Sequence, residues 1–526
     1  MSLLSIVVKA LEALDLDDDV NRLVIDRTVN VCRNRPHPWS TRHDYISWSG
    51  LTDRTYNARL LPAKPPTGQG RGTSRPPLDE VAALFARLPG TNQRLCSKST
   101  ALFPAFAQYL TDGFIRTMLH NDDALEDRRR TTSNHEIDMS PLYGRTEAQT
   151  RSLRSMSGGR LKSQMIGSEE FSPFLFGSDG AVKPEFAGLD LPLGIKNASP
   201  ANKATLFAVG GDRVNAVPQT AMMNTLFLRE HNRVAGMLAK NNPGWDDERL
   251  FETARNIIIV MFIKIVVEEY INHINTTSFK LQADPRVAWR AKWNRPNWMT
   301  VEFSLLYRWH GLVMENVTWG DKAHPGNSLL LNNRLLLDSG LAQSFVNTAA
   351  NRTAQLGLEN AANFMMFAEK GAINQARINN VASYNDYRIA MGMEPARNFA
   401  AIVGSSDDPT ENARLTALAG RLQALYGDVN NVEYYVGLFA ERVEKNGPLP
   451  ELISSMVAMD AFSQALTNPL LSEHVWGNPN NKRLAFTNAG IKLIEETNTL
   501  RDILKRNSSG LGSAFVGMTR KEWKRR

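Results

Sequence analysis

Cysteine is scarce in this chain of 526 residues, which contains only Cys32 and Cys96. A secreted framework held by several disulfide bridges needs more cysteines than that. This class of protein is therefore excluded, and a reducing compartment is expected. Residues 1–20 also lack a basic start, a long apolar run and a small-residue cleavage site. We therefore expect no signal peptide.

Long apolar runs are missing as well. The most apolar stretch, 257–267, contains Lys264 and is shorter than the ~20 residues that a membrane-spanning helix requires. It predicts a buried core helix, and we expect no transmembrane helix. These absences favour a protein that is cytoplasmic or lies peripherally on a membrane.

The chain carries a modest excess of positive charge: 61 basic and 54 acidic residues give a net charge of +7. Part of the excess lies in the basic tail, 511–526, which is expected to be a solvated end or to contact an anionic surface. The sequence shows neither a zinc finger nor a basic helix with a reading face. We therefore expect no nucleic-acid partner.

The N-terminal segment, 1–42, is predicted to form amphipathic helices. Its apolar side, between Leu3 and Leu14, is suited to peripheral contact with a membrane. Packing of this side on the protein's own core is the alternative. The acidic residues at 15–19 would be repelled by anionic lipid.

Helical periodicity dominates the rest of the chain. Apolar residues make up 42% and charged residues 22%, as in ordinary globular proteins, and the length suffices for a large core with an internal cofactor pocket. The apolar spacing predicts helices at 3–16, 20–32, 102–118, 145–155, 219–240, 246–273, 298–312, 341–349, 411–425, 450–466 and 488–505. Strand signals are short and scattered. The predicted fold class is mainly α with little β, in one large domain.

The most informative stretch is EFSLLYRWHGLV, which contains Tyr307 and His310. Residues three apart on a helix share one face, and a histidine nitrogen is the usual proximal ligand of haem iron. A tyrosine one turn away is placed to pass an electron to an oxidised haem. Taken alone, such a pair is more often ordinary core packing.

Several other stretches support the functional interpretation of this motif. They are HDYISWSGLTDRTYNARLLP at 43–62, FPAFAQYLTDGFIRT at 103–117, HEIDMSPLYGRTEAQTRSLRS at 135–155, FLREHNRVAGML at 227–238, WDDERLFETARNIIIVMFIKIVVEEYINHI at 245–274, YNDYRIAMGMEPARNFAAI at 384–402 and LYGDVNNVEYYVGLFAE at 425–441. In this order, and with EFSLLYRWH at 302–310 between the stretches at 245–274 and 384–402, they resemble animal haem peroxidases of the cyclooxygenase type. The YRWH spelling also occurs in related fatty-acid dioxygenases.

The resemblance covers roughly residues 15 to 505 and implies a mainly α catalytic domain, 43–510, with an internal haem between helices. It implies haem b as the cofactor, with His310 as the proximal iron ligand. It also implies that Tyr307 becomes a radical. Trp309, beside the cofactor, and Phe303, beside the substrate, would be pocket walls, although each could equally be plain core.

On the other side of the haem, the resemblance identifies Gln108 with the family's distal glutamine. Four residues later the family has a histidine that deprotonates peroxide, whereas this chain has Asp112. A carboxylate can act as a general base, but it is shorter than histidine and accepts hydrogen bonds only when ionised. We expect weak or slow peroxidase turnover, and a solvated helix residue is the alternative interpretation of Asp112.

The resemblance also suggests residues of a fatty-acid channel. Arg22 lies near the position of the family's carboxylate-binding arginine, and its planar guanidinium suits a carboxylate. Tyr270 keeps its family identity on the channel wall. Ser463 corresponds, to within a residue or two, to the serine that shapes the far end of the channel. A surface arginine is the alternative for Arg22.

The sequence therefore predicts a haem-dependent fatty-acid dioxygenase that uses a tyrosyl radical at Tyr307. Its expected partners are a polyunsaturated fatty acid, O2 and a peroxide activator. The resemblance also admits peripheral membrane contact and a homodimer. Two alternatives stay open at this point: a haem peroxidase that oxidises small donors with H2O2, and a non-catalytic haem protein.

Overall fold

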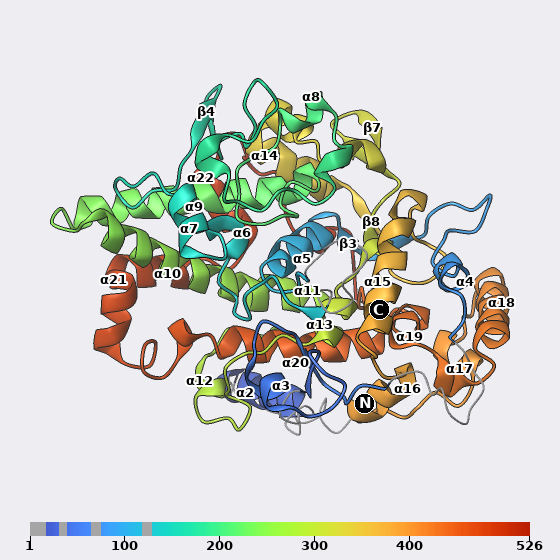
Figure 1. Cartoon of the computed structure of the whole chain (residues 1–526). Coiled ribbons are helices and arrows are strands. Elements are labelled where there is room, and N and C mark those ends of the chain that lie inside the picture. The colour runs from blue at the N-terminus through green and yellow to red at the C-terminus, as the bar shows by residue number, and fades with distance from the viewer. Residues whose placement is uncertain (1–16, 31–38, 65–74, 118–128, 526) are drawn as a thin grey trace.

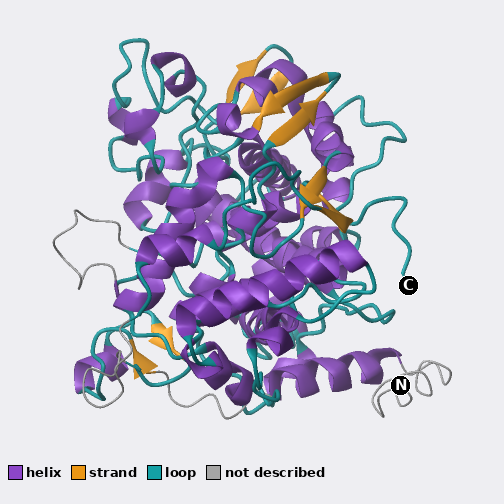
Figure 2. Ribbon diagram, turned by 90° about the vertical axis from the view of Figure 1, so that its right-hand side faces the viewer, coloured by secondary structure: helices purple, strands orange, loops and turns teal. Residues whose placement is uncertain are grey.

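The computed structural model describes residues 17–30, 39–64, 75–117 and 129–525 of the chain. Helices make up most of this part, and the strands form four small two-stranded antiparallel sheets. Figure 2 shows the strands toward the outside of the molecule, around a helical interior. The prediction of a mainly α fold with little β is confirmed. The predicted helix at 3–16 lies outside the described residues.

Long helices form the frame of the molecule. They are α2 (Asp17–Asn30), α5 (Leu102–Asp112), α9 (Pro218–Asn241), α10 (Asp247–Ile265), α14 (Arg334–Ala350), α15 (Met366–Ile378), α18 (Pro409–Tyr426), α20 (Glu451–Leu466) and α21 (Pro479–Glu495). In Figure 1, α5 lies in the middle of the molecule, with α9 and α14 above it and α20 below. Helix α9 packs on α5, α10 and α14, and α2 packs on α20.

Shorter elements connect this frame. The short α-helices are α3 (Trp48–Thr52), α4 (Leu78–Ala83), α6 (Ser140–Tyr143), α7 (Glu147–Leu153), α8 (Pro200–Lys203), α11 (Asn272–Ile274), α12 (Arg286–Trp289), α13 (Val301–Leu306), α16 (Tyr384–Ala390), α17 (Phe399–Val403), α19 (Tyr434–Ala440) and α22 (Leu500–Asn507). The strand pairs are β1 (Trp39–Ser40) with β2 (Ala58–Arg59), β3 (Leu95–Thr100) with β8 (Arg352–Ala354), β4 (Gln164–Ile166) with β5 (Glu169–Phe171), and β6 (Asn316–Trp319) with β7 (Lys322–Pro325).

Helix α10 contains the most apolar run of the sequence and is buried along most of its length. The Asp246 side chain caps its first turn by accepting a hydrogen bond from the Arg249 backbone N–H. The charged exception in the run, Lys264, reaches the end of α21, where its ammonium group donates to the carbonyl oxygens of Ile494 and Glu495 at 3.2 and 2.6 Å. Carbonyls at a helix C-terminus attract a cation, so Lys264 is accommodated at the edge of the core.

The chain continues from α10 into a π-helix, η4 (Val266–Ile271). A π-helical turn holds one more residue than an α-helical turn and changes the direction in which the following side chains point. Such turns occur often at functional sites. Tyr270 lies in this turn and is fully buried.

Two predicted helices are interrupted in the structure. The helix expected at 488–505 is two helices, α21 and α22, because Thr499 caps the second one with a capping box. The helix expected at 298–312 is α13 followed by a break and by the 3-10 helix η5 (His310–Leu312). Periodicity did not reveal either break.

The basic tail packs on the body over part of its length. Met518 is almost fully buried, and the Arg520 backbone N–H donates to the Lys98 carbonyl oxygen at 2.8 Å. The ammonium group of Lys98 lies 4.8 Å from the centre of the Trp523 ring. The backbone of this part of the tail therefore packs on the body, while Lys521, Lys524 and Arg525 are exposed. The predicted boundaries at 42, 43, 510 and 511 stay predictions.

A search of the described helices found no segment with the length and apolar character needed to cross a membrane.

The contact between α19 and α16 allows a test of the packing. A methyl group at Gly437 would overlap the ring of Tyr384, whereas Gly420, an exposed glycine in α18, has open space around it. We expect Gly437→Ala to lower the free energy of unfolding by about 1–3 kcal/mol through overpacking. Gly420→Ala should instead raise it by up to about 1 kcal/mol through helix propensity. Denaturant unfolding of both variants checks this, and equal effects would show that the contact is looser than described.

Candidate functional site

The phenol of Tyr307 lies in a buried group of aromatic rings. Its ring stacks on Trp309 at a centroid distance of 4.6 Å and meets Phe303 edge-on at 4.8 Å. The hydroxyl of Tyr270 donates a hydrogen bond to the Tyr307 oxygen at 3.2 Å. The structure therefore brings together four residues that the sequence analysis assigned to the reaction, the cofactor side and the substrate side.

The backbone explains how these side chains come to face one another. Thr300 caps α13, its side chain accepting a hydrogen bond from the Phe303 N–H. The helix ends after Leu306, and Trp309 has a ψ of 48°, which takes the chain out of helical geometry. The prediction that Tyr307 and His310 share one face of a helix is therefore wrong. Tyr307 contacts Tyr270, and His310 lies beside Glu369.

Burial determines the ionisation of Tyr307. It raises the pKa of the phenol above its ordinary value, although the hydrogen bond from Tyr270 acts in the opposite direction. The group is therefore a neutral phenol at neutral pH. Forming a radical from it requires the loss of a proton together with an electron.

His310 begins η5, and its side chain keeps 19% of its surface exposed. Its Nδ1 is buried without a hydrogen bond partner in the described part of the chain and lies 3.5 Å from Oε2 of Glu369. A histidine that binds a metal uses one ring nitrogen for the metal and turns the other toward an outer partner. The unpartnered imidazole of His310 fits the predicted iron ligand.

Gln108 lies on α5, whose other residues are almost all buried. It keeps some exposure, as does Pro104, one turn earlier on the same face. The Gln108 side-chain amide points to the carbonyl oxygen of Arg213, at 3.5 Å. This face of α5 is therefore directed at the loop that carries Arg213.

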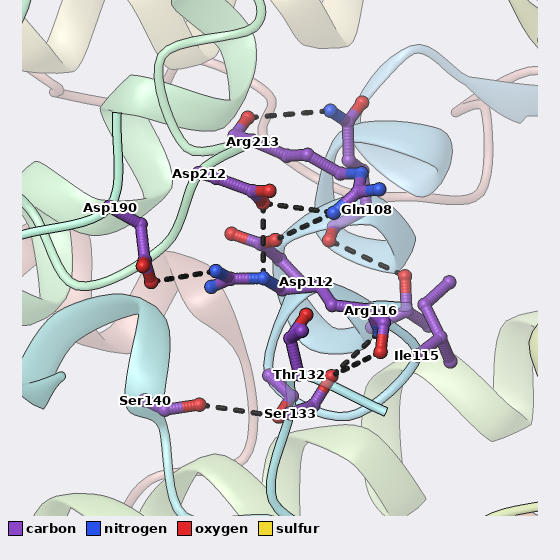
Figure 3. A network of polar contacts seen from close by, with 12 residues as sticks. Gln108, Asp112, Ile115, Arg116, Thr132, Ser133, Ser140, Asp190, Asp212 and Arg213 are labelled. Atoms are coloured by element: carbon purple, nitrogen blue, oxygen red, sulfur yellow. Dashed lines mark hydrogen bonds and ion pairs between the residues drawn. The ribbon is translucent and has the colours of Figure 1, made fainter. Parts of the chain in front are cut away.

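Asp112 lies one turn beyond Gln108 and is buried, with no exposed side-chain surface. Figure 3 shows it between Arg116 and Arg213. A guanidinium nitrogen of Arg213 lies 3.9 Å from Asp112 Oδ1, and neither carboxyl oxygen has a hydrogen bond partner among the described residues. A methyl group at Gly211 would overlap Asp112 Oδ2, so the loop closes tightly over this carboxyl. Asp112 is therefore not a solvated helix residue.

A second carboxyl group completes this network. Asp212 forms ion pairs with Arg116 at 3.1 Å and with Arg213 at 2.9 Å. Burial, and then the neighbouring Asp212, raise the pKa of Asp112 to about 7, while Arg116 and Arg213 act in the opposite direction. The Asp112 carboxyl, which the sequence analysis placed where the family has a distal histidine, therefore holds its proton into the neutral range.

Arg308, between Tyr307 and Trp309 in the sequence, lies close enough to this network for Arg213 and Asp212 to affect its pKa. Its guanidinium donates to the carbonyl and hydroxyl oxygens of Ser304 at 3.1 and 3.3 Å. Burial and the nearby Arg213 lower the pKa of Arg308 to about 10. No carboxylate oxygen of the described chain lies within 4.0 Å of it, so this cation suits an anionic group that the protein does not itself supply.

The other predicted substrate residues, Arg22 and Ser463, make their hydrogen bonds with partners other than Tyr307. Arg22 is 36% exposed and pairs with Asp284 at 2.9 Å, and the same carboxylate also binds Arg286 at 2.7 Å. Ser463 is buried in α20, where its hydroxyl donates to the Asp460 carbonyl oxygen at 3.1 Å. No hydrogen bond or ring contact in the described structure joins Arg22 or Ser463 to Tyr307. Their roles stay predictions.

Sequence reasoning missed several charged groups of the site. Two neighbouring glycines directly precede Asp212 and Arg213, and adjacent glycines signal a close approach of the backbone. That signal could have identified the loop. Arg308 lies within the YRWH motif, and its place there could have identified it as a charged group of the site. Glu369 shows no comparable signal, because it is one glutamate in an ordinary helical pattern.

Comparison with known families gives a match over most of the chain. Residues 107–514 match the family described as animal haem peroxidase. The matched range begins just before Gln108 and includes Asp112, Tyr307 and His310. Arg22 lies outside it.

Curated relatives and solved structures agree with this match. The chain is 30% identical to prostaglandin G/H synthase 1 of Rattus norvegicus over 86% of this chain and 72% of that protein. It is 31% identical to prostaglandin G/H synthase 2 of Oryctolagus cuniculus over 84% of this chain and 69% of that protein. The fold resembles fatty acid alpha-dioxygenase of Oryza sativa (TM-score 0.70, 16% identity, 98% and 97% coverage) and peroxidase A of Dictyostelium discoideum (0.66, 17%, 92% and 99%).

Burial of Asp112 leads to a prediction about how the free energy of unfolding depends on pH. Its pKa is higher in the folded state than the ~3.9 of an unfolded aspartate, so the folded protein binds the proton more tightly. The stability contributed by that proton is present at low pH and is lost as the pH rises toward 7, by up to ~1.4 kcal/mol per pH unit. Asp112→Asn carries no such proton. We expect its free energy of unfolding, relative to the unmodified protein, to rise by about 2 kcal/mol between pH 5.5 and 7.

Denaturant unfolding at several pH values in one buffer system measures this difference. Asp407→Asn, which removes an exposed carboxyl, serves as the control for a general effect of losing a carboxylate. Parallel pH curves for Asp112→Asn and the unmodified protein would show that Asp112 does not hold its proton as described.

Proposed function

This chain belongs to the animal haem peroxidase family, and from that premise we propose that it is a haem-dependent fatty-acid dioxygenase. Tyr307 would take a hydrogen atom from a polyunsaturated fatty acid, and O2 would add to give a hydroperoxide. The observation that carries the proposal is the buried Tyr307 phenol, hydrogen-bonded by Tyr270 and three residues before the unpartnered His310. The names of the relatives, prostaglandin G/H synthase and fatty acid alpha-dioxygenase, support this class of reaction.

The residues present fit haem b. His310 turns Nδ1 toward Glu369, which leaves Nε2 to bind the iron, and Trp309 has a buried Nε1 without a partner in the part of the chain that the structure describes. Arg308 offers a cation to the carboxylate groups of the cofactor, because it has no carboxylate of its own within 4.0 Å among the described residues. His310 and Arg308 would hold the group, with Trp309 as a wall.

Haem held in this way supplies, after reaction with a peroxide, a one-electron oxidant for a neighbouring phenol. The protein places Tyr307 as that phenol and keeps it protonated by burial. Tyr270 donates a hydrogen bond to the oxygen that becomes the radical centre. Trp309 and Phe303 pack on the ring, and little of Tyr307 is open to solvent.

In each turnover, the hydrogen atom that Tyr307 gains is given up again. The phenoxyl radical takes a hydrogen atom from a weak bis-allylic C–H bond, which restores the phenol and leaves a carbon radical. O2 adds to that carbon, and the resulting peroxyl radical takes the hydrogen atom back from the phenol. The products are a lipid hydroperoxide and the regenerated phenoxyl radical. A peroxide activator is therefore needed to generate the first radical and not for each cycle.

The distal side supports weak peroxidase activity. A general base must reach the proton that it removes, and it must be ionised. Asp112 is enclosed by Gly211 and Arg213 and holds its proton into the neutral range. We infer that Asp112 is a poor replacement for a distal histidine, and that Gln108 is left as the partly exposed polar group on this face of α5.

The substrate carboxylate is assigned to Arg22, with Ser463 shaping the far end of the channel. Arg22 now pairs with Asp284, but that carboxylate is also bound by Arg286. Asp284 therefore keeps a cationic partner when Arg22 turns to a fatty-acid carboxylate. Tyr270 and Phe303 contact Tyr307 and line the end of the path where the reacting carbon must lie.

Tyr307→Phe tests the radical step. We expect it to reduce fatty-acid-dependent oxygen uptake to the background rate while haem binding is retained, because the ring stays and only the hydroxyl is lost. Oxygen uptake with linoleate and a trace of peroxide measures the rate, and the haem absorption band measures loading. Tyr270→Phe, which removes the hydrogen bond but keeps the Tyr307 phenol, should retain part of the activity. Uptake by Tyr307→Phe at the normal rate would rule out the tyrosyl mechanism.

Arg22→Gln tests the binding of the carboxylate. A hydrogen bond to a charged group contributes roughly 1.5–3 kcal/mol, so we expect KM for linoleate to rise roughly 10- to 100-fold with a smaller change in kcat. Arg286→Gln is the matched control, because it removes the other arginine of Asp284 and leaves Arg22 in place. An equal rise of KM in both variants, or in neither, would contradict the assignment.

A further inference from the structure

A buried carboxylate stands beside the predicted iron ligand. Glu369 comes from α15, 59 residues after His310, and its side chain keeps only 2% of its surface exposed. Its Oε2 lies 3.5 Å from Nδ1 of His310. No other contact of the His310 ring nitrogens with a charged side chain is present in the described chain.

A tyrosine fixes this carboxylate in place. The hydroxyl of Tyr435, on α19, donates to Glu369 Oε2 at 2.7 Å. Tyr435 is fully buried, and its ring stacks on Phe85 and meets Phe439 edge-on at 5.5 and 4.9 Å. The oxygen that faces His310 is therefore held by a rigid group and not by a mobile surface side chain.

The charge of Glu369 is not balanced by a basic side chain. Within the described ranges, no lysine or arginine nitrogen lies within 4.0 Å of its carboxyl oxygens. A buried carboxylate is costly unless hydrogen bonds and a positive charge compensate it. His310 Nδ1 is also buried and unpartnered. Glu369 Oε2 therefore lacks a basic partner, and His310 Nδ1 lacks a hydrogen-bond acceptor. Each atom can supply what the other lacks.

We propose that Glu369 is a positioning residue for the iron ligand: its Oε2 accepts a hydrogen bond from the Nδ1–H of His310 when Nε2 binds haem iron. This proposal rests on the haem-binding part of the proposed function and is independent of the fatty-acid substrate. The proton on Nδ1 leaves the lone pair of Nε2 for the metal. The contact with Glu369 selects that tautomer and the ring orientation.

The electronic consequence follows from the negative charge. A carboxylate that accepts the Nδ1–H bond makes the imidazole a stronger electron donor to the metal. Stronger donation favours ferric over ferrous iron. Glu369 would therefore lower the reduction potential of the bound haem and strengthen the bond between His310 and iron.

The test is Glu369→Gln in the haem-loaded, full-length protein, read out without substrate. An amide keeps the size of the side chain and removes the charge. We expect the iron–histidine stretching band of the ferrous protein to move to lower frequency in the resonance Raman spectrum. We expect the preference for ferric iron to fall about tenfold, an upward shift of about 59 mV in the one-electron potential.

Glu302→Gln is the matched control. Glu302 is an equally buried glutamate on α13 that accepts a hydrogen bond from Tyr387 at 2.6 Å. Its replacement should leave the band and the potential unchanged. Tyr435→Phe keeps the Glu369 carboxylate but removes the hydrogen bond that fixes it. It should shift the band in the same direction by a smaller amount. This variant decides the question if Glu369→Gln does not load haem.

The outcomes separate the two proposals. The role of Glu369 would be overturned if Glu369→Gln left both the band and the potential unchanged. If Glu369→Gln does not load haem, an unchanged band in Tyr435→Phe would overturn it. The absence of an iron–histidine band in the unmodified protein would overturn both this role and His310 as ligand. A shifted band in a protein that takes up no oxygen with linoleate would support Glu369 and refute the dioxygenase.

Discussion

The departure of the backbone from helical geometry after Leu306 is the constraint on which the site depends. In a continuous helix, Tyr307 and His310 would lie on one face and pack against the same neighbouring element. The break sends the Tyr307 phenol toward Tyr270 and the His310 imidazole toward Glu369. Two residues only three apart thereby reach two different helices. The arrangement of the surrounding core fixes both directions, because α10 with η4 and α15 lie where these side chains arrive.

Two buried polar atoms at this break, on Trp309 and His310, have no hydrogen-bond partner among the described residues. In a folded protein nearly every buried polar group finds a partner, so each exception calls for an explanation. Trp309 Nε1, His310 Nδ1 and the Asp112 oxygens are exceptions in the described chain, and the guanidinium of Arg308 has no carboxylate within 4.0 Å there. Together they form an interior that is more polar and more charged than packing alone requires. A cofactor with two carboxylates would offer hydrogen-bond acceptors to Trp309 Nε1 and to the guanidinium of Arg308.

The sequence predicted the helical class, because apolar periodicity depends on local spacing. The apolar run of α10 needed no knowledge of distant segments, whereas the interpretation of the YRWH residues depended on the other stretches that share the family resemblance. The breaks after Leu306 and before Leu500 were missed because periodicity continues across them. Glu369, and Arg213 with its two glycines, lie far from Tyr307 in the sequence. Only the packing of α15 and of the 210–213 loop could show that they face the same site.

The enclosed Asp112 and the covered Tyr307 bear differently on the proposed chemistry. A peroxidase must cleave a peroxide in each cycle, so a distal group that holds its proton slows each turnover. An oxygenase that regenerates its phenoxyl radical needs that cleavage only at the start. Burial of Tyr307 against Trp309 and Phe303 then matters more than the distal base, because each loss of the radical to a reductant requires a new peroxide. The structure protects the phenol and leaves the distal carboxyl closed, which is the combination expected of an oxygenase with weak peroxidase activity.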